Sequence, residues 1–277
     1  MSFLHLPNEI ILQISEELSL GDVCHLLQTN RRLASLLSPA IIERICRERS
    51  REWCAKALYS AAERKDKAAA ALILEKTREV LNYTEDPTLL EELIKTQSET
   101  VFNTLLECWV EADIKYSPGL QTSLHLAAQH GRLATLRLLV ARDDVDVNSV
   151  DCGGLPPLLS AIKFGQYEIV MVKMLLADPR VKVNLRDNKG RAPLHFATCE
   201  GLDDLVELLL GANDIDVNLQ DHESKSPLLV AAIQGREAVT ELLLADERVD
   251  VNSADSHGRT PLYFAALGGR EEMVKLL

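Results

Sequence analysis

The sequence predicts an all-α protein, in which a solenoid of paired antiparallel helices with projecting turn-like loops follows a small three-helix module. The main observation is an internal repeat, whose first leucines are spaced 34, 36, 34 and 34 residues apart, at Leu124, Leu158, Leu194, Leu228 and Leu262. Periods of this length are typical of stacked two-helix units. The composition agrees, because only 4% of residues are aromatic while 47% are hydrophobic. A core of Leu, Ile, Val and Ala suits closely packed helices.

Each repeat is expected to hold two short helices separated by a glycine. The glycine lies seven residues after the first leucine, at Gly131, Gly165, Gly201, Gly235 and Gly269. Glycine adopts the left-handed conformation that ends a helix at little cost. A leucine ridge marks the second helix, and in the second repeat it arrives two residues late, as Met174-Leu175. We therefore place two extra residues inside that second helix.

A Val-Asn pair closes the units, with an aspartate three residues after each asparagine. These pairs end at Asn148, Asn184, Asn218 and Asn252, and the aspartates are Asp151, Asp187, Asp221 and Asp255. Because Asn and Asp are turn formers, they predict a projecting loop before each new unit.

This repeat resembles the ankyrin repeat, whose pattern is D-x-x-G-x-T-P-L-H-x-A-x-x-x-G. The closest matches to the turn begin at Gly190 and Gly258, although no unit carries the full T-P-L-H. The resemblance implies five ankyrin repeats over residues 118–277, the last of them incomplete. Residues 51–117 are interpreted as degenerate ankyrin-like repeats with Lys65 in the place of the glycine; the alternative is a plain helical linker domain. Because the sequence stops on an apolar ridge, we expect a fragment, a truncated product, or a covering partner at that end.

Residues 1–50 form the predicted three-helix module. Proline is tolerated in the first helical turn, and the following apolar residues recur at helical spacing. Surplus apolar surface on so small a module indicates a permanent partner. The segment resembles the F-box, with L-P-x-E-I-I, then D-V-x-x-L and T-N-R-R-L. The resemblance implies docking onto the Skp-type adaptor of a cullin–RING ubiquitin ligase through Leu6, Pro7, Ile10, Ile11, Ile14, Leu18, Val23 and Leu26. The alternative is an ordinary three-helix cap on the solenoid.

The candidate residues for binding a target protein lie on the predicted loops and at the ends of the inner helices, where the fold does not constrain the side chain. Arg186, Lys189 and Arg191 form a basic cluster that could grip an acidic peptide. Phe164, if exposed, is a candidate anchor, because buried aromatic residues dominate interface energetics. The alternative is that these positions are variable, solvated loop tips. The complete set is Lys163, Phe164, Arg186, Asn188, Lys189, Arg191, His222, Glu223, Lys225, His257 and Arg259.

Composition and motifs also bear on other classes of function. A formal net charge of −12 makes nucleic acid and acidic membranes improbable partners. Six unpatterned cysteines and the lack of a signal peptide or an apolar membrane segment favour an intracellular, cytoplasmic or nuclear location. Because the sequence contains no catalytic motif, we expect no enzymatic activity and no cofactor. His195 and Cys199 are four residues apart, but no third metal ligand lies near them, so we expect no metal site.

Two hypotheses about function follow from this reading. In the first, the chain is a protein-binding adaptor, a substrate receptor of a Skp–cullin–F-box ubiquitin ligase whose solenoid binds the target protein. In the second, it is an ankyrin scaffold without a role in ubiquitination.

Overall fold

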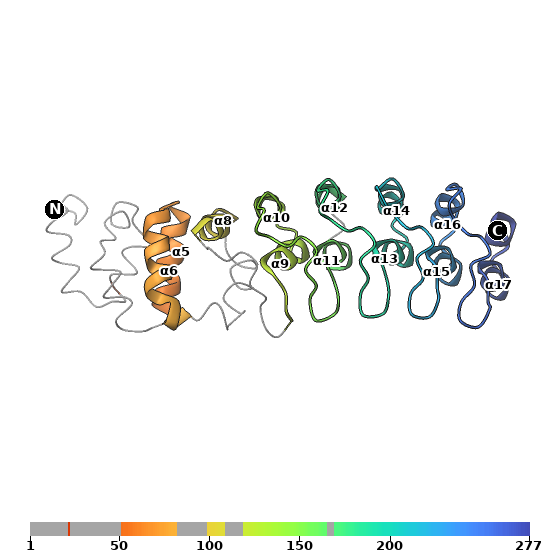
Figure 1. Cartoon of the computed structure of the whole chain (residues 1–277), viewed down its shortest axis with the longest axis horizontal. Helices are drawn as coiled ribbons and strands as arrows, with labels where there is room; N and C mark the ends of the chain where they lie inside the picture. The colour runs from red at the N-terminus through yellow and green to blue at the C-terminus, as the bar shows by residue number, and fades with distance from the viewer. Residues whose placement is uncertain (1–21, 23–50, 82–98, 109–118, 165–168) are drawn as a thin grey trace. The chain divides into compact units, whose positions relative to one another are not determined.

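The computed structural model describes residues 22, 51–81, 99–108, 119–164 and 169–277 (Figure 1). The chain divides into two compact units, Met1–Ser117 and Pro118–Leu277. The predicted adaptor-binding residues, from Leu6 to Leu26, lie outside the described residues. None of the helices in the described part is long and apolar enough to cross a membrane.

The described part of the first unit is a group of three helices that contact one another: α5 (Arg51–Glu63), α6 (Lys67–Leu81) and α8 (Glu99–Cys108). Leu58, Ile73 and Leu105 are fully buried between them. After α5 the chain turns at Lys65, whose φ is +61°. This left-handed residue stands where the later repeats carry glycine. The interpretation of residues 51–117 as degenerate repeats stays a prediction, and α5 and α6 are longer than any helix of the second unit.

The second unit is a row of helix pairs (Figure 1). The inner helices are α9 (Ser123–Gln129), α11 (Pro157–Phe164), α13 (Pro193–Glu200), α15 (Pro227–Gln234) and α17 (Pro261–Leu267). The outer helices are α10 (Leu133–Val140), α12 (Ile169–Leu176), α14 (Asp203–Leu210), α16 (Glu237–Leu244) and α18 (Glu271–Leu276). Each inner helix contacts the next inner helix, and each outer helix contacts the next outer helix. The predicted all-α solenoid with projecting loops is confirmed.

The repeat pattern explains where the inner helices begin and end. A hydroxyl residue caps α15 and α17, since Ser226 and Thr260 accept a hydrogen bond from the backbone N–H three residues on. Proline follows as the first helical residue, where a missing N–H costs nothing. At the other end of α13, Gly201 has a φ of +74°, and a Cβ there would lie 3.0 Å from the Arg236 side chain. The backbone conformation therefore favours glycine, and an added Cβ would also require the Arg236 side chain to shift.

The prediction that two extra residues lie inside the second helix of the second repeat concerns residues outside the described part and stays a prediction. Helix α12 has eight residues, the same length as α14 and α16. Helix α11 also matches α13 in length. The additional residues therefore precede Ile169 and fall in residues 165–168, outside the described part.

The asparagines of the first three Val-Asn pairs each join two repeats, a role beyond the predicted turn formation. The Asn184 side-chain amide donates to the carbonyl oxygen of Asp214 (2.6 Å), and its Oδ1 accepts from the N–H of Asp216 (3.0 Å). Asn148 and Asn218 make the same pair of bonds to the repeat that follows each of them. Because both ends of the amide are used, the repeats are fixed in register as well as packed.

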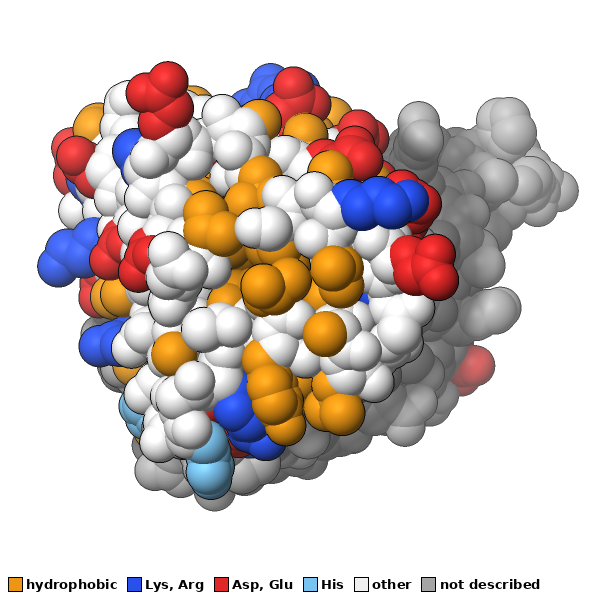
Figure 2. All heavy atoms as spheres, turned by 90° about the vertical axis from the view of Figure 1, so that its right-hand side faces the viewer, with side chains coloured by type: hydrophobic (Ala, Val, Ile, Leu, Met, Phe, Trp, Pro, Cys, Tyr) orange, Lys and Arg blue, Asp and Glu red, His pale blue; other side chains and the backbone are white. Residues whose placement is uncertain are grey.

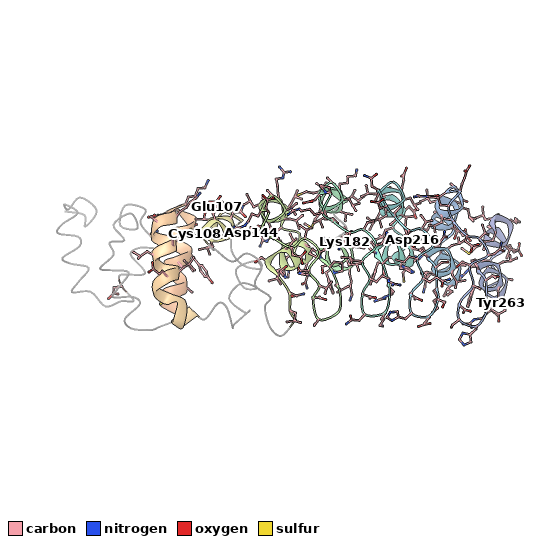
Figure 3. All side chains as sticks on the ribbon, viewed as in Figure 1. Glu107, Cys108, Asp144, Lys182, Asp216 and Tyr263 are labelled. Carbon is pink, nitrogen blue, oxygen red and sulfur yellow. The ribbon has the colours of Figure 1, made fainter. Side chains whose placement is uncertain are left out.

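Apolar side chains cover the C-terminal end of the second unit (Figure 2). Leu267 is 70% exposed, and other large hydrophobic side chains of α17 and α18 are exposed as well. Tyr263, which stands at the position of His195 two repeats earlier, is also exposed there (Figure 3). Val274 and Leu276 of the predicted apolar ridge are exposed at this end, together with Leu262, Tyr263 and Leu267 of α17.

Candidate protein-binding surface

The projecting loops are built around one aspartate each. The Asp187 Oδ1 atom accepts hydrogen bonds from the N–H groups of Lys189 and Arg191, both at 2.9 Å. The same two bonds, to the residues two and four positions on, recur at the other loop aspartates, Asp151, Asp221 and Asp255. The loop side chains therefore project from a fixed backbone.

Backbone hydrogen bonds also join each loop to its neighbours. Within a loop, the N–H of Asp187 donates to the carbonyl oxygen of Arg191, so the chain doubles back on itself. Between loops, the N–H of Asn188 donates to Gly153, and that of His222 donates to Lys189. Each repeat thus contributes two hydrogen-bonded chain segments to the row of loops. With about 4.8 Å between adjacent segments, the loops advance by about 10 Å per repeat.

Two of the predicted target-binding arginines are held in one shared arrangement. Arg191 donates from Nε and Nη2 to the buried Asp187 carboxylate, at 3.0 and 2.7 Å. Its guanidinium carbon lies 4.3 Å from the ring centroid of Phe196. Two repeats later, Arg259 pairs with Asp255 and lies 4.9 Å from the ring centroid of Phe264. Each arginine is thus fixed between a carboxylate and an aromatic ring.

The loop between these two arginines pairs its charges differently. Lys225 stands at the equivalent position, and its Nζ contacts Glu223 at 2.6 Å instead of the loop aspartate. The hydrogen bond from Lys225 lowers the pKa of Glu223, and the positive charges of Lys225, Lys189 and Arg259 lower it further. Glu223 is therefore an exposed carboxylate in the field of three cations from three successive loops.

A groove of about 670 Å³ lies on the same surface, between the loops and the inner helices of the second, third and fourth repeats. Cavities of this size accommodate peptide segments or small ligands. Seven predicted target-binding residues line it: Lys163, Asn188, Lys189, Arg191, His222, Glu223 and Lys225. These seven residues form the polar rim of the groove, and their role in binding a target stays a prediction.

Four predicted target-binding residues do not line this groove. Phe164 is 42% exposed at the end of α11, with the Lys163 ammonium 4.8 Å from its ring centroid. Arg186 is exposed and donates to the carbonyl oxygen of Gln220 in the next loop, at 3.3 Å. His257 and Arg259 belong to the last loop, one repeat beyond the groove. The structure therefore separates Arg186 from Lys189 and Arg191, which the sequence analysis treated as one cluster.

Sequence reasoning missed the apolar floor of the groove. Ile162, Phe196, Val230 and Ile233 line it beneath the charged rim, beside Cys199. A signal was present, because Phe196 and Val230 lie two residues after the first leucine of their repeats. The equivalent positions, Leu126 and Ser160, are buried, whereas Val230 is half-buried. Because burial at this position differs between repeats, an alignment of the repeats alone does not show that Phe196 and Val230 face the groove.

His195 is a buried residue whose ring joins two successive loops. It is 2% exposed, its Nδ1 accepts from the N–H of Ala192 (3.1 Å), and its Nε2 donates to the carbonyl oxygen of Lys225 in the next loop (2.9 Å). Burial lowers the pKa of His195, so the ring is neutral. Both ring nitrogens are therefore used, and neither is available to a metal. Within the described residues, no group of three or more His, Cys, Asp or Glu side chains could hold a metal ion.

The loop pairs predict an acid-dependent loss of stability. The hydrogen bond from Arg259 lowers the pKa of Asp255 to about 2, although burial opposes this shift. A folded-state pKa below the unfolded value means that the stabilisation is present above about pH 4 and is lost as the pH falls toward 2. We expect Asp255→Asn to be less stable than the wild type at pH 7, with a smaller difference at pH 3. Urea unfolding of both proteins at the two pH values measures this, and an equal difference would contradict it.

Comparisons with known proteins fit this geometry. A family model described as ankyrin repeats (three copies) matches residues 90–187, 124–221 and 194–277, which together cover more than half of the chain. An F-box-like family model matches residues 3–48. Among curated proteins, Alpha-latrotoxin-Lg1a from Latrodectus geometricus is 35% identical over 66 residues. That match covers 24% of this chain and 5% of the toxin, so the chain spans a small part of this relative's length.

Proposed function

The chain belongs to the ankyrin-repeat family and carries an F-box-like segment ahead of its repeats, and we propose that it is a substrate receptor of a Skp–cullin–F-box ubiquitin ligase. In this role the F-box-like segment binds the Skp-type adaptor, and the solenoid binds the protein to be ubiquitinated. The observation that carries the proposal is the pairing of these two kinds of interaction module in one chain. The groove on the repeats supplies a surface on which a target could be held.

We propose that the chain catalyses nothing itself. Such a receptor acts by raising the effective concentration of the target at the ligase, as two linked binding events do. The fixed loops and the groove support this role, because a rigid surface loses little conformational entropy when it binds. An intracellular location is part of this proposal, since the ligase acts on intracellular proteins.

A pull-down with a purified Skp-type adaptor tests the proposal. We expect the full chain to bind, and the double variant Leu6→Asp/Ile10→Asp to lose binding by at least tenfold, since it places two charges on the apolar docking face. Lys182→Glu is the matched control, because Lys182 lies on the solenoid away from the loop tips (Figure 3). If the wild-type chain does not bind the adaptor, the ligase role is wrong and the scaffold hypothesis replaces it.

A further inference from the structure

We propose that the groove of the ankyrin unit takes an extended, acidic segment of the target protein, with a carboxylate at about every third residue and apolar side chains between them. This inference rests on the proposed function, because it assumes that the solenoid holds the target. It goes further by giving the chemistry of the segment that is bound. Three features of the groove carry it.

The first feature is a set of exposed cations on a protein whose net charge is −12. Lys163 and Lys189 are exposed on the rim of the groove, and within the described residues neither forms an ion pair with a carboxylate. Unpaired cations that line a concave surface attract acidic ligands and exclude basic ones. The groove is lined by four cations and three carboxylates, Glu200, Asp221 and Glu223, so its lining is less acidic than the molecule as a whole.

The second feature is the guanidinium nitrogen Nη1 of Arg191 and Arg259, which does not take part in the ion pairs of these residues. Arg191 and Arg259 use Nε and Nη2 to bind their own loop aspartates. In both, Nη1 has no hydrogen-bond partner within the described residues. The aromatic ring and the carboxylate fix the orientation of each guanidinium in advance, so a target carboxylate that binds Nη1 need not order the side chain.

The third feature is Glu223, which already occupies a position suited to a target carboxylate. It is exposed, and the charges of Lys225, Lys189 and Arg259 lower its pKa. A carboxylate at this point of the rim is thus stabilised by cations of three successive loops. A bound acidic segment would compete with Glu223 for them, so removal of the Glu223 charge is expected to strengthen binding.

The spacing of the loops gives the register of the segment. Successive loops advance by about 10 Å. A polyproline-II segment rises about 3.1 Å per residue and has three residues per turn, so residues i and i+3 lie on the same side about 9.3 Å apart. Acidic residues at i and i+3 would therefore face Arg191 and Lys225 in the groove, and one at i+6 would face Arg259, one repeat beyond it. The apolar residues between them would face the floor formed by Phe196, Val230 and Ile233.

Selection of peptides from a displayed library of random 12-residue sequences, with the full chain as bait, tests this inference. The selected pool is expected to be enriched in Asp and Glu at a three-residue period, with apolar residues between them. The tightest of these peptides, labelled with fluorescein, is then titrated with each variant. We expect Lys163→Glu/Lys189→Glu to weaken binding about tenfold, Glu223→Gln to strengthen it about threefold, and Lys182→Glu to change it less than about twofold.

A pool without acidic enrichment, or an acidic peptide that binds Lys163→Glu/Lys189→Glu as well as it binds the wild type, overturns the inference. Circular dichroism and urea unfolding of each variant separate loss of binding from loss of fold. The adaptor pull-down uses the other end of the chain and reports on the ligase role independently. If the chain fails to bind the adaptor but still selects acidic peptides, the proposed function alone is refuted. If the chain binds the adaptor but does not select acidic peptides, the inference about the groove alone is refuted.

Discussion

Replacement of Leu209 by alanine is expected to lower the free energy of unfolding of the ankyrin unit by about 3 kcal/mol. Leu209 is fully buried on α14, the outer helix of the third repeat. Helix α14 contacts α12 and α16 on its two sides, and α13 within its own repeat. The substitution leaves a cavity at the junction of these helices. Because a solenoid is stabilised by contacts between neighbouring repeats, the loss affects both interfaces of the central repeat.

The adjacent Leu208→Ala is the matched control. Leu208 belongs to the same leucine pair and the same helix, but it is only half-buried, so its removal is expected to cost less than about 1.5 kcal/mol. Urea unfolding of the full chain, followed by circular dichroism, compares the midpoints of the two variants with that of the wild type. Equal losses for Leu208→Ala and Leu209→Ala would show that the central interfaces are not packed as described.

This contrast also shows how far the sequence determines the fold. The repeat period predicts the helix pairs, the glycine ends and the leucine ridge, because each depends on a residue type that recurs at a fixed position. The ridge pattern does not tell Leu208 from Leu209. Which of the two is fully buried depends on the rotation of α14 against its neighbours, and that rotation follows from packing between repeats.

Part of the candidate binding surface could also be predicted by comparing the repeats with one another. Loop positions that vary between repeats, such as Lys189 and Lys225, identify the rim of the groove. The pairing of their charges was not predictable. Arg191 pairs with its loop aspartate, whereas Lys225, at the same position, pairs with Glu223. This difference depends on side-chain length and on the neighbouring loop, which a single repeat does not reveal.

Replacement of His195 by alanine is expected to lower the free energy of unfolding by about 3 kcal/mol, and His222→Ala is expected to change it by less than about 0.5 kcal/mol. His195 is buried and bonds the N–H of Ala192 and the carbonyl oxygen of Lys225 in the next loop. Its removal leaves both groups without these partners and opens a cavity between two repeats. His222 lies in the next repeat and its side chain is exposed. His222→Ala therefore measures the effect of removing an imidazole that is not buried.

The pH dependence of stability tests the same bonds without removing the side chain. Burial lowers the pKa of His195, so between its folded value and about 6.5 the unfolded chain binds a proton that the folded chain does not. Stability is therefore fully present above about pH 6.5 and falls as the pH decreases below it. A second proton on Nδ1 would also face the N–H of Ala192, which now donates to that atom. We expect the urea midpoint of the wild type to fall between pH 7 and 5 more steeply than that of His195→Ala, while His222→Ala follows the wild type. Parallel pH profiles for the wild type and His195→Ala would contradict a neutral, doubly bonded His195.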